Sequence, residues 1–405
     1  MIPHICRLSP PAPPLKKLRF VEVNLLQAII KAIPVGMFVF LAAPNSSPNA
    51  QSLETPARNA YVIDLATNTV LLDKSADAPM PPASMSKLMT VYMVFDHLKK
   101  GSLALDDKFL VSRKAWRKGG SKMFVKLGKR VSVSDLLRGI IVQSGNDACI
   151  VIAEGLGGSE DTFSEMMTLR AKEIGLSQSN FANATGWPHP KHHMSARDLA
   201  ILSSRLVSDF PELYKMFAEK TFTYNKIKQS NRNPLLYRDI GSDGLKTGYT
   251  RKAGYGLAAT AIRGDRRIIM VINGLKSVRQ RSQESLRLME WAFRLFKPYE
   301  LFKKDEVITK ADIWLGDKPS VGLQIPEGLK LTLSREARDK MKVKVRMQNP
   351  VAAPVRKGQK LATLIISAPN LKTREIPLIA SQDVGQLGFF GRIGAAIKHV
   401  LWGSS

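Results

Sequence analysis

The chain has 405 residues, of which 61 are Lys or Arg and 34 are Asp or Glu, so its formal net charge is +27. This length allows more than one domain, and the two cysteines, Cys6 and Cys149, exclude a scaffold built on many disulfide bonds. No nucleic-acid-binding motif accompanies the scattered basic residues. We therefore expect no nucleic-acid partner, and attraction to an anionic membrane surface is the simpler explanation of the charge.

The first 50 residues predict an export signal. Three basic residues between positions 16 and 19 precede a short apolar run at residues 35–43, and residues 48–50 offer a cleavage site with small side chains. The apolar run is shorter than the ~20 residues that a bilayer requires, so a retained membrane anchor is the weaker alternative. We therefore predict that residues 1–50 are a signal peptide, whose removal would take Cys6 with it.

A Ser-x-x-Lys motif opens the first predicted helix. Pro81 and Pro82 precede Ser84, and because proline favours a first helical turn and is excluded from a helix interior, Ser84 should lie at the helix N-terminus. Lys87 stands one turn later on the same face, where it can accept the proton of the Ser84 hydroxyl. The N–H groups of a helix N-terminus also face a developing oxyanion. Apolar residues at helical spacing from 88 to 98 predict that this helix is buried.

Two further motifs follow along the chain. Ser144-Gly145-Asn146 falls between two helical patterns, where a tight loop can direct two polar side chains into a cleft. Lys246-Thr247-Gly248 opens a pattern of strands, with two β-prone runs and a hairpin turn between residues 255 and 273. Each motif alone is typical of a helix cap, a turn or a strand end. The three in this order indicate a serine nucleophile that transfers acyl groups.

The three motifs together match the set found in penicillin-binding proteins and class A β-lactamases. The surrounding segments, residues 61–64, 82–84, 243–250 and 252–255, resemble the low-molecular-mass D-alanyl-D-alanine carboxypeptidases of the penicillin-binding protein 5/6 type. The resemblance covers nearly the whole chain after the predicted signal peptide. It implies an α/β catalytic domain of the β-lactamase/DD-peptidase type, in which an antiparallel sheet carries helices on both faces beside an all-α subregion. It implies no cofactor and no metal.

Site residues carry over from the family motif by motif. Ser84 would be acylated by the penultimate D-alanine of a peptidoglycan stem peptide and release the terminal D-alanine, with Lys87 as general base, before water hydrolyses the acyl-enzyme. Ser144 and Lys246 would relay protons and hold the carboxylate end of the substrate. Asn146 would bind the peptide amide. β-Lactams would acylate the same serine as covalent inhibitors.

The family also implies the residues around the reacting carbonyl group. The backbone N–H groups of Ser84 and Tyr249 would form the oxyanion hole, and Tyr249 stands where relatives often carry histidine. Thr247 and Gly248 would border the substrate beside them, and a glycine at 248 lets the substrate lie against the strand edge. Arg232 and Arg267 fall where the family places arginines near the substrate terminus, so we expect both at the substrate.

The domain organisation follows from the change of pattern near residue 297. We predict a catalytic domain over residues 51–297, which ends in a helix over 280–296, and a β-rich stalk domain over 298–386 because short β-prone runs alternate with Pro and Gly. Residues 387–405 combine apolar side chains with Arg392 and Lys398, and in a helix the apolar residues would face one side, as in an interfacial helix. We expect this helix to attach the exported protein peripherally to anionic lipid on the outer face of the inner membrane, facing the periplasm. A helix packed on its own domain is the alternative.

Other functions remain open. A D,D-endopeptidase uses the same chemistry on peptidoglycan cross-links, and a noncatalytic wall-associated scaffold would belong to a different class. A β-lactamase needs a carboxylate to activate the deacylating water, and Glu173 only partly reproduces that element, so we expect slow deacylation of penicillin. His189, His192 and His193 lack a fourth ligand and a rigid helical frame, so we expect a surface loop there. Cys149 is expected to pack in a helix without a catalytic role.

Overall fold

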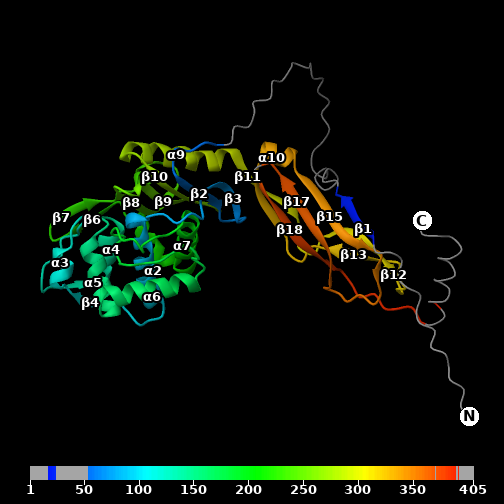
Figure 1. The fold of residues 1–405 in the computed structure, drawn as a ribbon, viewed down its shortest axis with the longest axis horizontal. Helices are drawn as coiled ribbons and strands as arrows, with labels where there is room; N and C mark the ends of the chain where they lie inside the picture. The colour runs from blue at the N-terminus through cyan, green and yellow to red at the C-terminus, as the bar shows by residue number, and fades with distance from the viewer. Residues whose placement is uncertain (1–16, 24–52, 370, 389–390, 392–405) are drawn as a thin grey trace, which may run out of the picture. The chain divides into compact units, whose positions relative to one another are not determined.

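A computed structural model describes residues 17–23, 53–369, 371–388 and 391, drawn in colour in Figure 1. The chain forms two compact units that divide between Phe296 and Lys297, next to the predicted boundary. The apolar run and cleavage site of the predicted export signal lie outside the described residues, as does nearly all of the predicted C-terminal helix. Among the described residues, no helix is both long enough and apolar enough to cross a bilayer.

The larger unit is built on a five-stranded antiparallel sheet, as the resemblance implied. Its strand order is β3 (Thr69–Lys74), β2 (Asn59–Asp64), β10 (Arg266–Leu275), β9 (Gly254–Arg263) and β8 (Ser242–Thr250). The predicted hairpin joins β9 to β10, with Arg266 paired to Arg263. The sheet combines β2 and β3, near the start of the larger unit's sequence, with β8, β9 and β10, near its end. The Lys-Thr-Gly motif lies on β8, at the edge of the sheet.

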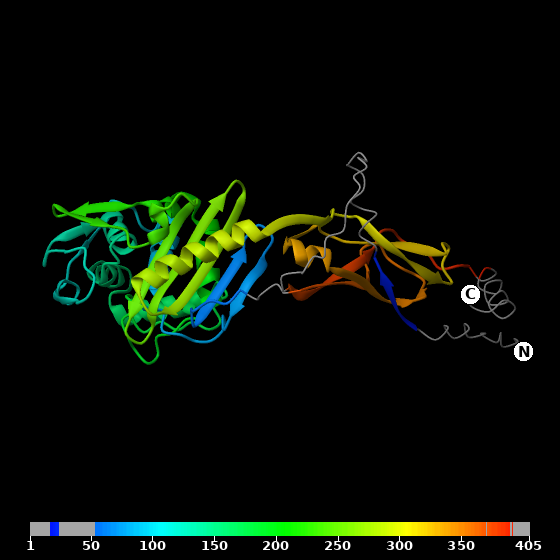
Figure 2. The ribbon, with the colours of Figure 1, turned by 90° about the horizontal axis from the view of Figure 1, so that it is seen from above.

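Helices cover both faces of this sheet. Side chains alternate between the two faces of a strand, and both sets are apolar on β10: Ile268, Met270 and Ile272 belong to the core that includes helix α9 (Val278–Leu295). Ile269 and Val271 belong to the core that includes the helices of the opposite face. Figure 2 shows α9 lying along one face of the sheet. The predicted architecture of a sheet between helical layers is therefore confirmed.

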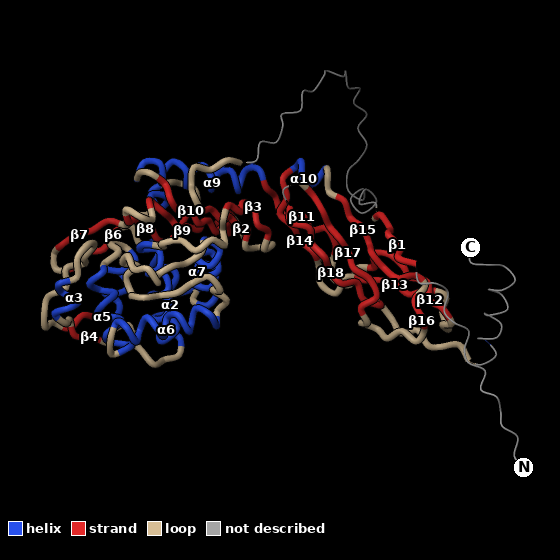
Figure 3. Tube along the Cα trace, in the orientation of Figure 1, coloured by secondary structure: helices blue, strands red, loops and turns tan. Residues whose placement is uncertain are grey.

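The remaining helices of the larger unit, most of them in its all-helical part, are drawn in Figure 3. In chain order they are α2 (Lys87–Lys99), α3 (Arg113–Arg117), α4 (Val133–Ile141), α5 (Asn146–Gly157), α6 (Glu160–Glu173), α7 (Ala196–Asp209) and α8 (Pro211–Tyr214), with 3-10 turns η1 (Ala83–Ser86), η2 (Lys215–Ala218) and η3 (Pro234–Tyr237). A pair of short antiparallel strands, β4 (Lys108–Leu110) and β5 (Arg130–Ser132), encloses α3 in sequence, and β6 (Thr221–Tyr224) and β7 (Ile227–Ser230) form a hairpin. Serine side chains cap the N-termini of α3, α4, α6, α7 and α9, which fixes where these helices begin.

The smaller unit is β-rich, as predicted. Its seven-stranded sheet has the order β1 (Lys17–Glu22), β15 (Lys342–Asn349), β17 (Lys360–Ala368), β18 (Leu371–Ala380), β13 (Ser320–Gln324), β12 (Val307–Trp314) and β16 (Val351–Ala352). A second sheet pairs β11 (Phe296–Phe302) with β14 (Leu329–Ser334), and α10 (Arg335–Asp339) follows β14. A core that includes Leu323, Leu331, Val345, Leu364 and Leu378 fills this unit.

Strand β1 was not expected from the sequence. It pairs antiparallel with β15, from Lys17 opposite Asn349 to Glu22 opposite Lys344. The basic residues of this segment indicated the charged part of an export signal, and charge alone does not reveal an edge strand. The removal of residues 1–50 stays a prediction. If the segment is removed, β15 becomes the edge of the sheet.

Candidate active site

The predicted nucleophile and base lie together at the start of the central helix. Ser84 belongs to η1, and Lys87 is the first residue of α2. Lys87 Nζ lies 3.0 Å from Ser84 Oγ, and it also donates a hydrogen bond to the carbonyl oxygen of Thr185. Because residues 87–95 of α2 are all buried, the base is held in a packed helix, as the apolar spacing predicted. The contact has the geometry that a lysine base needs to draw a proton from a serine.

Burial changes the protonation of Lys87. The side chain is completely buried, and burial lowers the pKa of Lys87 to about 8. This value already includes the nearby positive charges of Arg232 and Lys118, which also favour the neutral amine. A lysine with this pKa is neutral in about one molecule in ten at pH 7, far more often than an exposed lysine, and only the neutral amine can accept a proton.

The Ser-Gly-Asn motif connects α4 to α5. Ser144 adopts a left-handed backbone conformation with φ of 67°, and its buried Oγ has no hydrogen-bond partner among the described residues. Asn146 begins α5, and its Nδ2 donates to the carbonyl oxygen of Gly119 at 2.8 Å. The tight loop expected between two helices is therefore present. The buried hydroxyl of Ser144 is available to a proton acceptor or a bound molecule.

Strand β8 supplies the third motif. Lys246 is buried, and burial, followed by the nearby charge of Lys87, holds the pKa of Lys246 well below its ordinary value. A Cβ atom at Gly248 would lie 2.9 Å from the carbonyl oxygen of Pro82 and 3.1 Å from Cγ of Met85. Glycine is therefore needed for the close packing of β8 on η1, a reason that the sequence analysis did not give. Packing at this distance brings the Lys-Thr-Gly strand beside the nucleophile.

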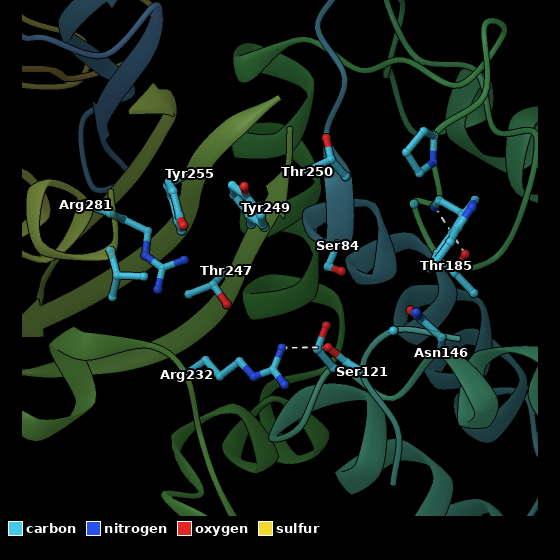
Figure 4. A pocket seen from close by; sticks show the side chains of 17 residues that line it. Ser84, Ser121, Asn146, Thr185, Arg232, Thr247, Tyr249, Thr250, Tyr255 and Arg281 are labelled. Carbon is cyan, nitrogen blue, oxygen red and sulfur yellow. Dashed lines mark hydrogen bonds between the residues drawn. The ribbon is translucent and has the colours of Figure 1, made fainter. Parts of the chain in front are cut away.

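A cavity of about 530 Å³ joins these elements (Figure 4). Its lining includes Ser84, Ser121, Ser144, Asn146, Thr185, Gly186, Trp187, Arg232, Thr247, Gly248, Tyr249, Tyr255 and Arg281. Seven of the ten residues predicted for the site line it. The lining does not include Lys87, Lys246 or Arg267, although Lys87 contacts Ser84, which does line it. No described residue of the lining is Asp or Glu. The cavity therefore combines a serine nucleophile with cationic and neutral polar groups.

Two arginines in the cavity can bind an anion. Arg232 donates from Nη1 to Ser121 Oγ at 2.6 Å, and Arg281, in the first turn of α9, approaches the ring of Tyr255 at 5.9 Å. Figure 4 shows both guanidinium groups on the same side of Ser84 as Thr247, with Asn146 on the opposite side. Burial lowers the pKa of Arg281 to about 10, so its guanidinium is charged at neutral pH. Positively charged planar groups at one end of a cavity suit a carboxylate.

The placement of Arg267 at the substrate was wrong. Arg267 lies on β10, where its guanidinium forms an ion pair with Asp243 at 2.8 Å and a hydrogen bond to Thr260 Oγ1 at 2.9 Å. Burial opposes its charge, but the hydrogen bond with Asp243 raises the pKa of Arg267. Arg267 therefore stabilises the start of strand β8, to which Asp243 belongs. Arg281 is the second arginine of the cavity, and the sequence analysis missed it.

The loop that contains Thr185 was also missed. Asn183 Oδ1 accepts hydrogen bonds from Thr185 N at 3.1 Å, Thr185 Oγ1 at 2.9 Å and Trp187 N at 3.0 Å, and its Nδ2 donates to Trp187 O. Gly186 has φ of 76°, and a Cβ atom there would collide with the carbonyl group of Ala83. This loop therefore presses on η1 while its Thr185 carbonyl oxygen contacts the base. The sequence alone does not show that Gly186 packs against Ala83.

Asp147 organises the loop on the other side of the cavity. Its buried carboxylate accepts hydrogen bonds from the backbone N–H groups of Met123, Phe124 and Val125 at 2.9 to 3.2 Å, and from Ala148 at 3.0 Å. These bonds hold residues 119–125, of which Gly120 and Ser121 line the cavity. The charge of Asp147 is thus satisfied inside the fold.

Three remaining expectations have mixed outcomes. Glu173 lies at the end of α6, exposed and paired with Arg170 at 2.8 Å, so it does not line the cavity. Cys149 is buried in α5, and burial raises the pKa of its thiol to about 12, which agrees with a packing role. The surface position expected for His192 was wrong. Its ring is buried against Phe181, its Nδ1 accepts from Ala182 N at 3.2 Å, and burial lowers its pKa to about 4.

Comparisons with known proteins agree with this geometry. The sequence model of the D-alanyl-D-alanine carboxypeptidase family matches residues 45–277, and that of the penicillin-binding protein 5 C-terminal domain matches residues 296–386. D-Alanyl-D-alanine carboxypeptidase DacC of Escherichia coli is 38% identical over 378 residues, which cover 90% of this chain and 94% of the relative. D-Alanyl-D-alanine endopeptidase of the same organism is 29% identical and covers 65% of this chain and 86% of the relative.

Solved structures give the same result. Penicillin-binding protein 5 from Haemophilus influenzae superposes with a TM-score of 0.71 at 34% identity, covering 83% of this chain and 99% of that one. Penicillin-binding protein D2 from Listeria monocytogenes, solved in its ampicillin-bound form, superposes with a TM-score of 0.55 at 32% identity, covering 61% of this chain and 100% of that one. The chain belongs to the D-alanyl-D-alanine carboxypeptidase family.

Proposed function

We propose that this protein is a serine-type carboxypeptidase that removes the terminal D-alanine from peptidoglycan pentapeptide stems through an acyl-enzyme on Ser84. The observation that carries the proposal is the 3.0 Å contact between Ser84 Oγ and the buried amine of Lys87, at the wall of a cavity that also holds the other two motifs. Family membership supports the reaction. Ser84, Lys87, Ser144, Asn146 and Lys246 are the residues to which we assign the chemistry.

Acylation begins when the neutral amine of Lys87 takes the proton from Ser84 Oγ. The oxygen then attacks the carbonyl carbon of the penultimate D-alanine, and the backbone N–H groups of Ser84 and Tyr249 stabilise the oxyanion that forms. A single oxyanion donor is typically worth ~3 kcal/mol. Ser144 and Lys246 return a proton to the leaving nitrogen, and the peptide bond breaks to release D-alanine. Asn146 holds the amide of the stem beside Ser84.

The terminal carboxylate of the substrate fits the arginine side of the cavity. Arg232, Arg281 and Thr247 lie together there (Figure 4). A charge-assisted hydrogen bond contributes about 1.5 to 3 kcal/mol, and an oriented guanidinium distinguishes a free carboxylate from an amide. The free carboxylate of a terminal D-alanine therefore suits this side of the cavity.

Deacylation needs an activated water molecule. Because no described Asp or Glu lines the cavity, the bases available to that water are the lysines and Ser144. A penicilloyl group would therefore leave slowly, and β-lactams would act as covalent inhibitors. The ampicillin-bound form of the Listeria relative supports this expectation.

Cellular location belongs to the same proposal. We place the enzyme outside the cytoplasmic membrane on the sequence of residues 1–50, and we assign peripheral attachment to anionic lipid to residues 387–405. Attachment of this kind weakens with salt because the Debye length shortens from about 10 Å at 0.1 M to 3 Å at 1 M. Release of the protein from isolated membranes by 1 M NaCl, and retention at 0.1 M, would support it.

Mass spectrometry of muropeptides tests the reaction. The wild-type protein and S84A are each incubated with purified pentapeptide monomers and with cross-linked dimers. Loss of one D-alanine from monomers by the wild-type protein alone supports the proposal, and scission of dimers would support the endopeptidase instead. If neither protein changes the monomers or the dimers, the noncatalytic scaffold remains. Covalent labelling of S84A by penicillin would show that Ser84 is not the nucleophile.

A further inference from the structure

One part of the larger unit concentrates positive charge beside the cavity. Residues 108–132 contain nine Lys and Arg and no Asp or Glu, and residues 220–230 contain three Lys and again no acidic residue. We name these two segments together the basic lobe. Figure 1 shows its elements α3, β4, β6 and β7 at the same end of the larger unit. In the chain as a whole, by contrast, 34 acidic residues accompany the 61 basic ones.

Hydrogen bonds join the two segments of the basic lobe into one surface. Asn225 Nδ2, at the tip of the β6–β7 hairpin, donates to the carbonyl oxygen of Phe124 at 3.0 Å. Gln229 Nε2 donates to the carbonyl oxygen of Lys122 at 3.2 Å. Asp147 fixes the same loop from the inside through its three bonds to Met123, Phe124 and Val125. The cations of the lobe are therefore displayed on an ordered backbone.

Most of the charge on the lobe is not neutralised within the fold. Of its twelve cations, only Lys114 forms an ion pair with a described residue, at 2.9 Å from Glu160. The carboxylate of Glu154, at the base of the lobe, accepts a hydrogen bond from Ser112. Like charges placed together destabilise a fold unless they meet a partner of opposite charge. The lobe is therefore suited to an anionic partner.

Two exposed aromatic rings lie among these cations. Trp116 is 44% exposed and Phe124 is 47% exposed. Phe124 also adopts a left-handed backbone conformation, with φ of 67°, which is rare for a bulky residue. The fold therefore holds a large apolar ring toward solvent at a conformational cost. Exposed aromatic rings with adjacent cations are typical of interaction surfaces.

The basic lobe is continuous with the cavity. Gly120 and Ser121 belong to the lobe and line the cavity wall. Lys118 Nζ lies 4.9 Å from the ring centroid of Trp187, which also lines the cavity. Lys126 is five residues from Ser121 along the chain, so its Cα atom lies within about 18 Å of that wall. A long substrate whose end enters the cavity can therefore reach the lobe with its next portion.

We propose that the basic lobe binds the polymeric glycan–peptide of the cell wall, so that polymer rather than free precursor is the preferred substrate; this inference rests on the proposed function. Carboxylates of neighbouring stems meet the lysines, and the apolar faces of sugar rings pack on Trp116 and Phe124. The positive lobe also raises the local concentration of an anionic polymer near the cavity. An anionic lipid surface shares the charge but lacks the continuity with the cavity, which is why the polymer is favoured.

Charge reversal at exposed positions tests the inference. Lys126 and Lys129 are exposed and form no ion pair with described residues, so K126E/K129E changes the lobe without touching the cavity. The matched control is K172E/K342E, which applies the same charge change to exposed lysines outside the lobe. Full-length proteins are compared on insoluble purified peptidoglycan and on a short soluble peptide that ends in D-alanyl-D-alanine. Sedimentation with the insoluble polymer at 0.05 to 0.5 M NaCl measures binding directly.

We expect K126E/K129E to lower kcat/KM on the polymer and binding to it about tenfold at low salt, and the loss to shrink as salt rises. Turnover of the short peptide and the rate of penicillin acylation should stay within a factor of two of the wild-type values. The control variant should match the wild-type protein on both substrates. A second variant, F124A, should weaken polymer binding with less dependence on salt, because it removes apolar contact and no charge.

Other outcomes would overturn the inference. An equal loss on the short peptide would mean that the lobe only shapes the cavity, and an equal loss in the control would mean that net charge alone matters. Unchanged polymer binding with weakened binding to vesicles of anionic phospholipid would assign the lobe to the membrane. Failure of the proposed function is separate, since the wild-type protein would then leave the short peptide intact.

Discussion

The substitution K87M should stabilise the fold while it abolishes catalysis. Burial holds the pKa of Lys87 at about 8 in the folded protein, against an ordinary value of 10.5. Because the unfolded chain binds this proton more tightly than the folded protein does, the protonated lysine destabilises the folded state at every pH below about 8. The gap between the two pKa values corresponds to about 3 kcal/mol.

Methionine has a similar length and no charge, so K87M removes this penalty. It also removes the hydrogen bond from Lys87 Nζ to the Thr185 carbonyl oxygen, which costs about 1 kcal/mol. We therefore expect K87M to be about 2 kcal/mol more stable than the wild-type protein at pH 7. As pH rises from 8 toward 10.5, the folded wild-type protein loses the proton while the unfolded chain keeps it, and the advantage of K87M should shrink and then change sign.

Urea unfolding of both proteins at pH 7, 8, 9 and 10 measures this difference, and penicillin labelling measures the loss of the base. K172M is the control, because Lys172 is exposed and its substitution should change stability by less than about 0.5 kcal/mol. A K87M protein that is less stable than the wild-type protein at pH 7 would refute the reasoning. So would a difference in stability that stays constant between pH 8 and 10.

Three further substitutions test the walls of the cavity. R281A should raise KM for the short peptide about tenfold or more, since it removes one charge-assisted contact to the terminal carboxylate, and steady-state kinetics would detect it; an unchanged KM would exclude Arg281 from that role. G186A should destabilise the protein by about 3 kcal/mol or more and abolish penicillin acylation, because the new Cβ meets the carbonyl group of Ala83, and normal labelling with an unchanged urea midpoint would contradict this. N183A should slow penicillin acylation about tenfold, because it removes the hydrogen bonds that hold the Thr185 carbonyl oxygen against Lys87. N180A is the control: it removes one hydrogen bond to Lys191 in the same loop and should leave the acylation rate unchanged.

The reactive groups could be predicted from the sequence because short-range rules place them. Helical spacing brings Ser84 and Lys87 together within one turn, and their 3.0 Å contact needs no distant part of the chain. The layers of the larger unit were predictable for a similar reason, since alternation and apolar runs report burial directly. Even so, the placement of Ser144 beside these residues rested on the resemblance to a known family.

The supporting groups of the cavity could not be predicted, because long-range packing decides them. The sequence does not distinguish Arg232 from Arg267 as a substrate-binding residue. Only the structure shows that Arg267 is engaged in an ion pair with Asp243. Arg281 did carry a signal that went unused. It stands at helical spacing with Ser285, Leu288 and Ala292 on the buried face of α9, and an arginine on a buried face needs a reason.

The chemistry of the cavity follows from what burial does to different cations. Lys87, with its pKa lowered to about 8, can lose its proton near neutral pH, whereas Arg281 stays charged at pH 7 even after burial lowers its pKa to about 10. The same desolvation therefore yields a base at one end of the cavity and a fixed positive charge at the other. Because no described carboxylate lines the space between them, neither group is neutralised by the protein itself. The substrate brings the matching negative charges: its terminal carboxylate binds the arginines, and its oxyanion develops at Ser84 as Lys87 takes up the serine proton and becomes positive.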